Sequence, residues 1–207
     1  MTWIFLHGLG QMPSDWQPVL RRLEPELTVH CPSLPELAAD DPRYPALLSA
    51  LETALDSIPG PLHLCGLSLG GVLAMDYALR HPERVASLVL CGTPLTMPRN
   101  LLRLQDFLFR LMPERAFAGS GFSREAMRQL AGSMAELDLR PRLPELGCPV
   151  LVLCGSKDRA NRKAARELAE QLPQARLHWI AGAGHEANLD SPEVMAELLR
   201  GFCQSLS

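Results

Sequence analysis

The sequence lacks long hydrophobic runs, metal-type cysteine spacings and an excess of basic residues. No stretch of its 207 residues approaches the roughly eighteen consecutive apolar residues that a membrane helix needs. The N-terminus, MTWIFLHGLG, has neither a basic segment nor a small-residue cleavage site, so we expect a structural strand there and no signal peptide. These absences predict a cytoplasmic protein without a membrane partner.

Cysteine and charge exclude further classes. The six cysteines show no CxxC and no Cys/His ligand spacing, and several end apolar runs, so we expect reduced thiols in the core. A formal net charge of −3 and a pI near 6.1 argue against nucleic-acid binding, which usually needs a basic surface.

The sequence does contain a regular alternation of short apolar runs and longer amphipathic segments. The apolar runs cover residues 2–6, 28–31, 62–65, 86–91, 149–154 and 176–180. Several are continuously apolar, which is typical of parallel strands with helices on both faces. The order predicts an α/β fold, a doubly wound and mainly parallel sheet of about six strands that binds ligands beyond the carboxyl ends of its strands.

Residues 95–147 interrupt this alternation, because they hold prolines at their margins, no convincing strand and helical patterns inside. We expect a core of residues 1–94 and 148–207 with residues 95–147 inserted as a helical cap. One cap helix is predicted to turn an apolar stripe toward the core or a pocket and a basic stripe toward solvent. The apolar stripe is Met97, Leu101, Leu104, Leu108 and Leu111, and the second, mainly basic stripe holds Arg99, Arg103, Asp106 and Arg110.

The stretch LHLCGLSLGG (62–71) places Ser68 between glycines directly after an apolar run. A G-x-S-x-G match is weak by itself, but here a strand pattern precedes it and a helix pattern follows it, as a nucleophile elbow requires. Gly66 and Gly70 would let strand and helix approach closely while Ser68 projects from the bend. The alternative is a serine that caps a helix behind a tight turn.

A serine nucleophile needs a general base that is oriented by a third group. His185 suits the base, since AGAGHEANL places it in a small-residue loop just past the last strand. Asp158 suits the acid, since it follows the run PVLVLC and lies between Ser68 and His185 in the chain. Asp106 and Asp138 compete on chain order but fall in the predicted cap. The alternatives are a plain loop histidine and a turn-forming aspartate.

Two backbone N–H groups are candidates for an oxyanion hole. Leu69 follows the nucleophile at the positive end of its helix, and Leu9 lies in the glycine loop HGLGQ after the first strand. HGLG is a poor dinucleotide loop, because the third glycine and an acidic residue ending the next strand are missing.

HGLG, GLSLGG, LVLCGSKD and GAGH, in this order, resemble the motifs of the α/β-hydrolase superfamily over essentially the whole chain. The resemblance implies a lid at residues 95–147 and a chain that starts at the usual third strand, without the usual N-terminal antiparallel strands. The segment at 31–44 departs from the glycine-containing loop of many relatives, which limits the transfer of substrate specificity. By resemblance the nucleophile is Ser68, the acid Asp158, the base His185, and the oxyanion donors Leu9 and Leu69.

Within that superfamily, AELDLRPRLPELGCPVLVLCG is similar to small carboxylesterases, including those that demethylate pimeloyl-carrier-protein methyl ester. The implied reaction is hydrolysis of a carboxylic ester of a small or medium acyl group, through an acyl-enzyme and without metal or organic cofactor. The same triad would serve a thioesterase, a lactonase or a C–C bond hydrolase, and the same fold a ligand-binding receptor or scaffold.

An acyl-carrier protein is a further candidate partner. Residues 95–147 carry eight Arg against six Asp and Glu, a formal +2, whereas residues 1–94 carry five basic and ten acidic groups, a formal −5. A basic cap surface would attract an acidic carrier. The alternative is an ordinary solvated helix face.

Overall fold

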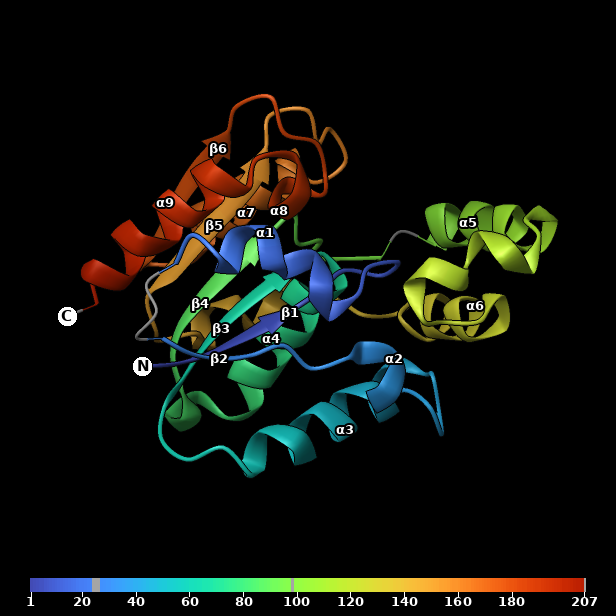
Figure 1. Cartoon of the computed structure of the whole chain (residues 1–207), viewed down its shortest axis with the longest axis horizontal. Helices are drawn as coiled ribbons and strands as arrows, with labels where there is room; N and C mark the ends of the chain where they lie inside the picture. Colours follow the sequence, from blue (N-terminus) through green and yellow to red (C-terminus); the bar gives the residue numbers. More distant parts are fainter. Residues whose placement is uncertain (24–26, 98, 207) are drawn as a thin grey trace.

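The sheet confirms the predicted fold class. The computed structural model describes residues 1–23, 27–97 and 99–206, apart from the side chains at 99–101, 103–105 and 118. The strands are β1 (Thr2–Leu6), β2 (Thr28–His30), β3 (Leu62–Leu67), β4 (Val85–Cys91), β5 (Val150–Gly155) and β6 (Ala175–Ile180). They form one sheet in the order β2-β1-β3-β4-β5-β6, and each described pair is parallel (Figure 1).

Two hydrophobic cores cover the two faces of the sheet. Outside residues 95–147 the helices are α1 (Gln17–Leu20), α2 (Leu34–Leu37), α3 (Tyr44–Asp56), α4 (Leu69–Arg80), α7 (Arg162–Gln171), α8 (Ala187–Asp190) and α9 (Pro192–Gln204). Successive side chains of a strand point to opposite faces, so Trp3 and Phe5 of β1 join the core under α1 and α9, whereas Ile4 and Leu6 join the core under α3, α4 and α7. This double burial explains the continuously apolar strand runs.

The strand order places a topological switch point between β1 and β3. The strand that follows β1 in the chain, β2, lies beside β1 at one edge of the sheet, and the next strand, β3, lies on the opposite side of β1. In open α/β sheets, ligands bind at such a point, beyond the carboxyl ends of the strands. Here those ends lead into the HGLG loop and into Ser68.

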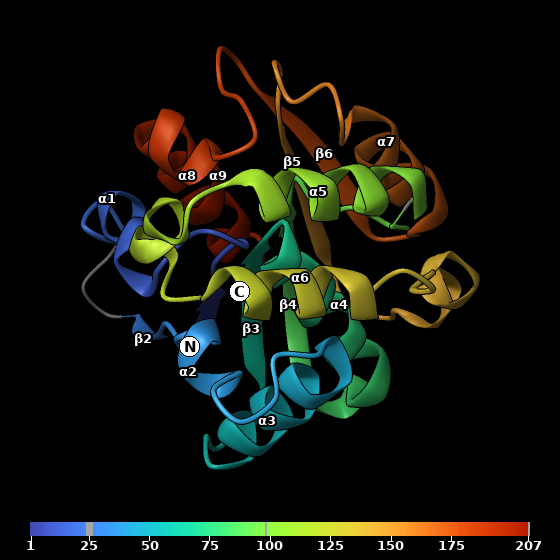
Figure 2. The ribbon, with the colours of Figure 1, turned by 90° about the vertical axis from the view of Figure 1, so that its right-hand side faces the viewer.

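Between β4 and β5 the chain forms α5 (Arg99–Leu111), α6 (Arg124–Ser133) and three short 3-10 turns. Figures 1 and 2 show α5 and α6 beyond the carboxyl ends of the strands, crossing in front of the sheet. An antiparallel bridge joins Thr96 to Asp138, and the Leu139 N–H donates to the Leu95 carbonyl over 3.3 Å, so the segment begins and ends at one neck. That residues 95–147 act as a functional cap stays a prediction.

The predicted orientation of α5 is wrong where the structure describes it. Leu108 and Leu111 are exposed, by 49% and 68%, whereas Leu102 and Phe109 face a cavity. Asp106, predicted on the second stripe, forms an ion pair with Arg128 of α6 (2.6 Å), and Phe109 makes an edge-on contact with Phe117 in the segment before α6. Of the remaining stripe residues, Met97 lines the cavity from outside the helix and Arg110 is exposed, as predicted. The side chains of Leu101, Leu104, Arg99 and Arg103 lie outside the description.

The six cysteines are free thiols, but only three of them are buried in the core as predicted, whereas Cys31, Cys148 and Cys203 are partly exposed. Cys65, Cys91 and Cys154 are buried in adjacent strands, and burial raises the pKa of Cys154 to about 11. Within the described ranges, each helix is too short or too polar to cross a bilayer.

Candidate active site

Ser68 occupies a strained bend between β3 and α4. Its φ of 54° and ψ of −114° make it the one non-glycine residue with positive φ in the described ranges. Side chains avoid this region, so the surrounding packing must hold the bend. A Cβ on Gly66 would lie 2.2 Å from the Gly70 carbonyl oxygen, and one on Gly70 would lie 2.1 Å from the Leu6 carbonyl oxygen. The two glycines therefore do permit the close approach of strand and helix that the motif predicted.

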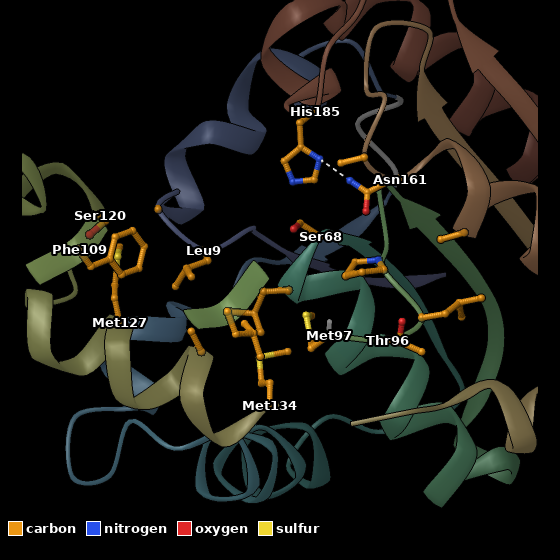
Figure 3. Close-up of a pocket in the computed structure, with 18 of the residues that line it drawn as sticks. Leu9, Ser68, Thr96, Met97, Phe109, Ser120, Met127, Met134, Asn161 and His185 are labelled. Carbon is orange, nitrogen blue, oxygen red and sulfur yellow. Dashed lines mark hydrogen bonds between the residues drawn. The ribbon is translucent and has the colours of Figure 1, made fainter. Parts of the chain in front are cut away.

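His185 and Asp158, predicted from separate motifs, meet in the structure. The His185 Nδ1 atom lies 2.8 Å from Asp158 Oδ2, and Asp158 is only 5% exposed. Ser68 and His185 line the same cavity, and Figure 3 shows the serine hydroxyl on the side of the imidazole away from Asn161. Because a carboxylate only accepts, Nδ1 carries the proton and Nε2 is left to act as a base.

The electrostatics of the pair favour charge on both partners. The hydrogen bond that His185 donates to Asp158 raises the pKa of His185 above its usual range, although partial burial opposes this. Burial alone would raise the pKa of Asp158, but hydrogen bonds from His185 and Asn161 outweigh it and lower that pKa below its usual range. These directions favour an ionised Asp158 and a protonated His185 ring.

The loops that carry His185 and Asp158 are joined by backbone contacts. The Lys157 N–H donates to the Ala183 carbonyl over 2.8 Å, and a Cβ on Gly155 would come within 2.0 Å of the Gly184 carbonyl oxygen. At the end of β4, Gly92 has a φ of 52°, and a Cβ there would lie 3.1 Å from both Asp158 Oδ2 and His185 Nδ1. Because Gly92 has no side chain, the Asp158 and His185 side chains fit beside it without a close contact.

The glycine loop after β1 passes close to Ser68. A Cβ on Gly8 would lie 3.6 Å from the Cβ of Ser68, and Leu9 and Leu69 both line the cavity. The Gly8 N–H donates to Gln11 Oε1 over 3.3 Å, whereas the described chain offers no hydrogen-bond acceptor to the Leu9 or Leu69 N–H. These two predicted oxyanion donors are therefore available to a ligand.

Two buried side chains that the sequence analysis missed hold this loop. The His7 ring donates from Nδ1 to the Gly8 carbonyl (3.0 Å) and accepts at Nε2 from the Leu34 N–H (3.1 Å). Burial lowers the pKa of His7, so it stays neutral. Gln11 donates to Asn188 Oδ1 (3.2 Å) and Glu186 Oε1 (3.3 Å), which links the glycine loop to the segment after His185.

A cavity of about 870 Å³ opens above Ser68. Its apolar wall comes from the glycine loop and from residues 95–147, as Figure 3 shows for Leu9, Met97, Phe109, Met127 and Met134. The opposite wall is more polar and comes from the start of α7, near His185. A volume of this size lies within the range of small-molecule binding pockets.

Asn161 was also missed. Its amide lies against both Asp158 and His185, yet from sequence it is only a polar residue three places after the predicted acid. His7 opens the quoted HGLG motif, so that motif was the available signal for it.

In the described chain, no group of three or more His, Cys, Asp or Glu side chains is arranged to hold a metal ion.

Curated relatives agree with the predicted enzyme class. A pimeloyl-[acyl-carrier protein] methyl ester esterase from Aromatoleum aromaticum is 30% identical, over 95% of this chain and 95% of the relative. The protein of the same name from Aeromonas hydrophila subsp. hydrophila is 29% identical, over 96% of this chain and 94% of the relative. These names support an ester-hydrolysing enzyme and leave the triad roles untested.

Solved structures and a family match settle the fold. MenH from S. aureus has a TM-score of 0.86 at 18% identity, over 100% of this chain and 94% of that chain. An enol-lactonase from Burkholderia xenovorans LB400 has a TM-score of 0.82 at 21% identity, over 98% and 91%. At these identities the likeness shows the fold alone. Residues 3–198 match the family described as "Alpha/beta hydrolase family", and the chain therefore belongs to it.

Proposed function

We propose that the chain is a serine carboxylesterase that cleaves the ester of a small or medium acyl group through a Ser68–His185–Asp158 triad. One observation carries the proposal: a strained, glycine-flanked serine shares a largely apolar cavity with a histidine whose Nδ1 is held by a buried carboxylate. A structural serine in a helix cap would need neither the backbone strain nor the histidine.

The mechanism follows from the donor and acceptor roles. His185 Nε2 removes the Ser68 proton as the hydroxyl oxygen attacks the ester carbonyl, and Asp158 stabilises the imidazolium. The negative charge on the carbonyl oxygen is stabilised by the Leu9 and Leu69 N–H groups. The imidazolium then protonates the departing alcohol, and a water molecule repeats the cycle to release the acid.

The cavity supports an acyl substrate. Its methionine, leucine and phenylalanine side chains would bind an alkyl chain through burial, and unbranched methionines adapt to chains of different shape. The helices of residues 95–147 would then serve as a lid that covers the chain and limits water at the ester.

An acyl-carrier protein is the proposed source of the acyl group, since the relatives above are named for a carrier-linked methyl ester. Most acidic groups of residues 95–147 pair with neighbouring arginines, for example Glu114 with Arg124 and Glu145 with Arg142. Arg115 is exposed and has no ion-pair partner in the described chain. The excess positive charge of this segment would steer an acidic carrier toward the cavity.

A fluorophosphonate probe tests the chemistry directly, because it labels an activated serine. We expect labelling of the parent chain, none for Ser68→Ala, and a loss of ester hydrolysis on the order of 10⁴-fold in that variant. Matched methyl esters, thioesters and lactones of equal chain length then separate the esterase from its alternatives. An unlabelled parent chain would point to a binding protein, and faster thioester or lactone cleavage would replace the proposed substrate.

The carrier is tested with the charge reversals Arg110→Glu and Arg115→Glu, with Arg176→Glu on β6 as the control far from α5 and α6. Each variant is assayed with pimeloyl methyl ester on a carrier and with the same free ester. We expect a higher KM for the carrier-linked ester only, and an effect that shrinks with added salt. Equal effects on both substrates would remove the carrier from the proposal.

A further inference from the structure

Asn161 stands at the start of α7 but does not cap that helix. An asparagine at this position usually accepts a hydrogen bond from an N–H of the first turn. The Asn161 side chain makes no such bond. Its amide nitrogen instead donates to Asp158, at 3.1 Å from Oδ1 and 2.9 Å from Oδ2, and its backbone N–H lies 3.3 Å from Oδ1.

The carboxylate of Asp158 is therefore held from two sides. Within the described chain, His185 and Asn161 supply all the hydrogen bonds that it accepts. A buried carboxylate needs such partners, because each unsatisfied oxygen carries a desolvation cost. Without Asn161, only the bond to His185 would fix its rotation.

The amide also lies 3.2 Å from His185 Nδ1, and the orientation of the amide follows from its partners. Turning its oxygen toward Asp158 would place two acceptors face to face, so the NH₂ group must point to the carboxylate. It cannot donate to Nδ1 while that nitrogen carries its own proton. His185 and Asn161 are therefore two competing donors to the Asp158 carboxylate. Figure 3 shows the contact between the Asn161 amide and the His185 ring.

We infer that Asn161 is a positioning residue for the triad: it fixes the orientation of Asp158 and takes up part of its acceptor capacity, which limits how strongly Asp158 stabilises the His185 imidazolium. The inference rests on the proposed function. It assigns Asn161 no contact with the reacting atoms, and its effect passes through Asp158 and His185.

Two substitutions separate this role from a helix cap. Asn161→Ala removes the donor to Asp158. It would also lower the stability of α7 if Asn161 acted as the cap of that helix. Asn161→Asp is a good capping residue at a helix N-terminus, but it would place a second carboxylate against Asp158. Arg166→Ala is the matched control, because Arg166 lies on the same helix, outside the cavity, and its guanidinium stacks on Trp179.

The variants are assayed with p-nitrophenyl butyrate for kcat, KM and the pH profile of kcat/KM. We expect Asn161→Ala to lower kcat roughly tenfold to a hundredfold, because the base is misplaced, and to change KM by a smaller factor, because one polar side chain is lost from the cavity wall. Its acid limb should move to higher pH, since Asp158 then serves His185 alone. Glu186, the other charged group that acts on the imidazole, is unchanged. Asn161→Asp should lose more activity without a lower unfolding midpoint, and Arg166→Ala should match the parent.

Titration of the His185 ring by NMR keeps this test separate from the proposed function. A parent chain that neither hydrolyses esters nor binds the fluorophosphonate overturns the proposed function, while the ring pKa still reports the contact with Asn161. An upward shift of that pKa in Asn161→Ala supports the inference. An unchanged or lowered pKa overturns it, as does an active Asn161→Asp variant with parental kcat.

Discussion

Replacing Gly70 by alanine tests the close packing that holds the elbow. The added Cβ would lie 2.1 Å from the Leu6 carbonyl oxygen and 2.7 Å from the His7 carbonyl oxygen. Ordinary contact begins at 3.4 Å, so strand β1 and helix α4 would have to separate by about 1.3 Å. Both obstructing atoms belong to the backbone, which cannot rotate away as a flexible side chain would.

The expected loss has two parts. Overpacking of this kind costs about 1–3 kcal/mol of the free energy of unfolding, and we expect the upper end because no side chain can adjust. The displacement also separates Leu9 from Leu69, which lie on the two sides of the contact. A shift of about 1 Å between catalytic groups lowers the rate roughly a hundredfold, so kcat/KM should fall by about that factor even in the folded fraction.

The assays are urea unfolding and hydrolysis of p-nitrophenyl butyrate. Gly201→Ala is the control, because Gly201 lies in α9 and an added Cβ would meet nothing within 4 Å. That variant should gain up to about 1 kcal/mol from helix propensity and keep its activity. A Gly70→Ala protein with an unchanged urea midpoint and kcat/KM within twofold of the parent would refute the packing argument.

The remaining predictions concern the pH dependence of activity and stability and three substitutions. In the proposed mechanism only neutral His185 acts as a base, and its pKa is raised, so kcat/KM should rise with pH through an apparent pKa above the ordinary value of 6.5. A flat profile from pH 5 to 8 would contradict the assignment of His185. Asp158→Asn should lower the rate about 10⁴-fold. The His185–Asp158 pair should add to the free energy of unfolding only between two pH limits. Its contribution should be lost as pH falls through the lowered pKa of Asp158 and as pH rises through the raised pKa of His185, which urea midpoints at a series of pH values would measure. Gln11→Leu leaves the Gly8 N–H without its acceptor and the buried Asn188 Oδ1 without the Gln11 donor. The urea midpoint should therefore fall by the equivalent of about 1–3 kcal/mol, and kcat should fall as well; unchanged values would mean that the link between the two loops is dispensable. Tyr44→Phe removes the 3.0 Å hydrogen bond to buried Asp76, far from Ser68, so stability should fall by about 1–3 kcal/mol while kcat remains parental, and an equal loss of kcat would show that this network reaches the site.

The sequence alone determined the sheet and the strand ends at which the predicted triad residues lie. Apolar runs, glycines and chain order are local properties, and parallel strands necessarily bring their carboxyl ends to one edge of the sheet. Ser68, Asp158 and His185 each follow a strand pattern, so their placement at one edge of the sheet could be expected from the sequence. The strain at Ser68 was likewise implied by a turn that needs glycine on both sides.

The tertiary structure decided which face of α5 turns inward. Helical periodicity shows that a helix has faces, but α5 has apolar residues on opposite sides, with Leu108 and Leu111 on one and Leu102 and Phe109 on the other. The choice depends on the pairing of Asp106 with Arg128 across two helices.

The same holds for the polar side chains around the triad. Gln11 reaches Asn188 across 177 positions in the chain, and Asn161 leaves its own helix uncapped to reach Asp158. No local pattern carries such partners, because a buried amide takes whichever donors and acceptors the folded chain brings within about 3 Å of it.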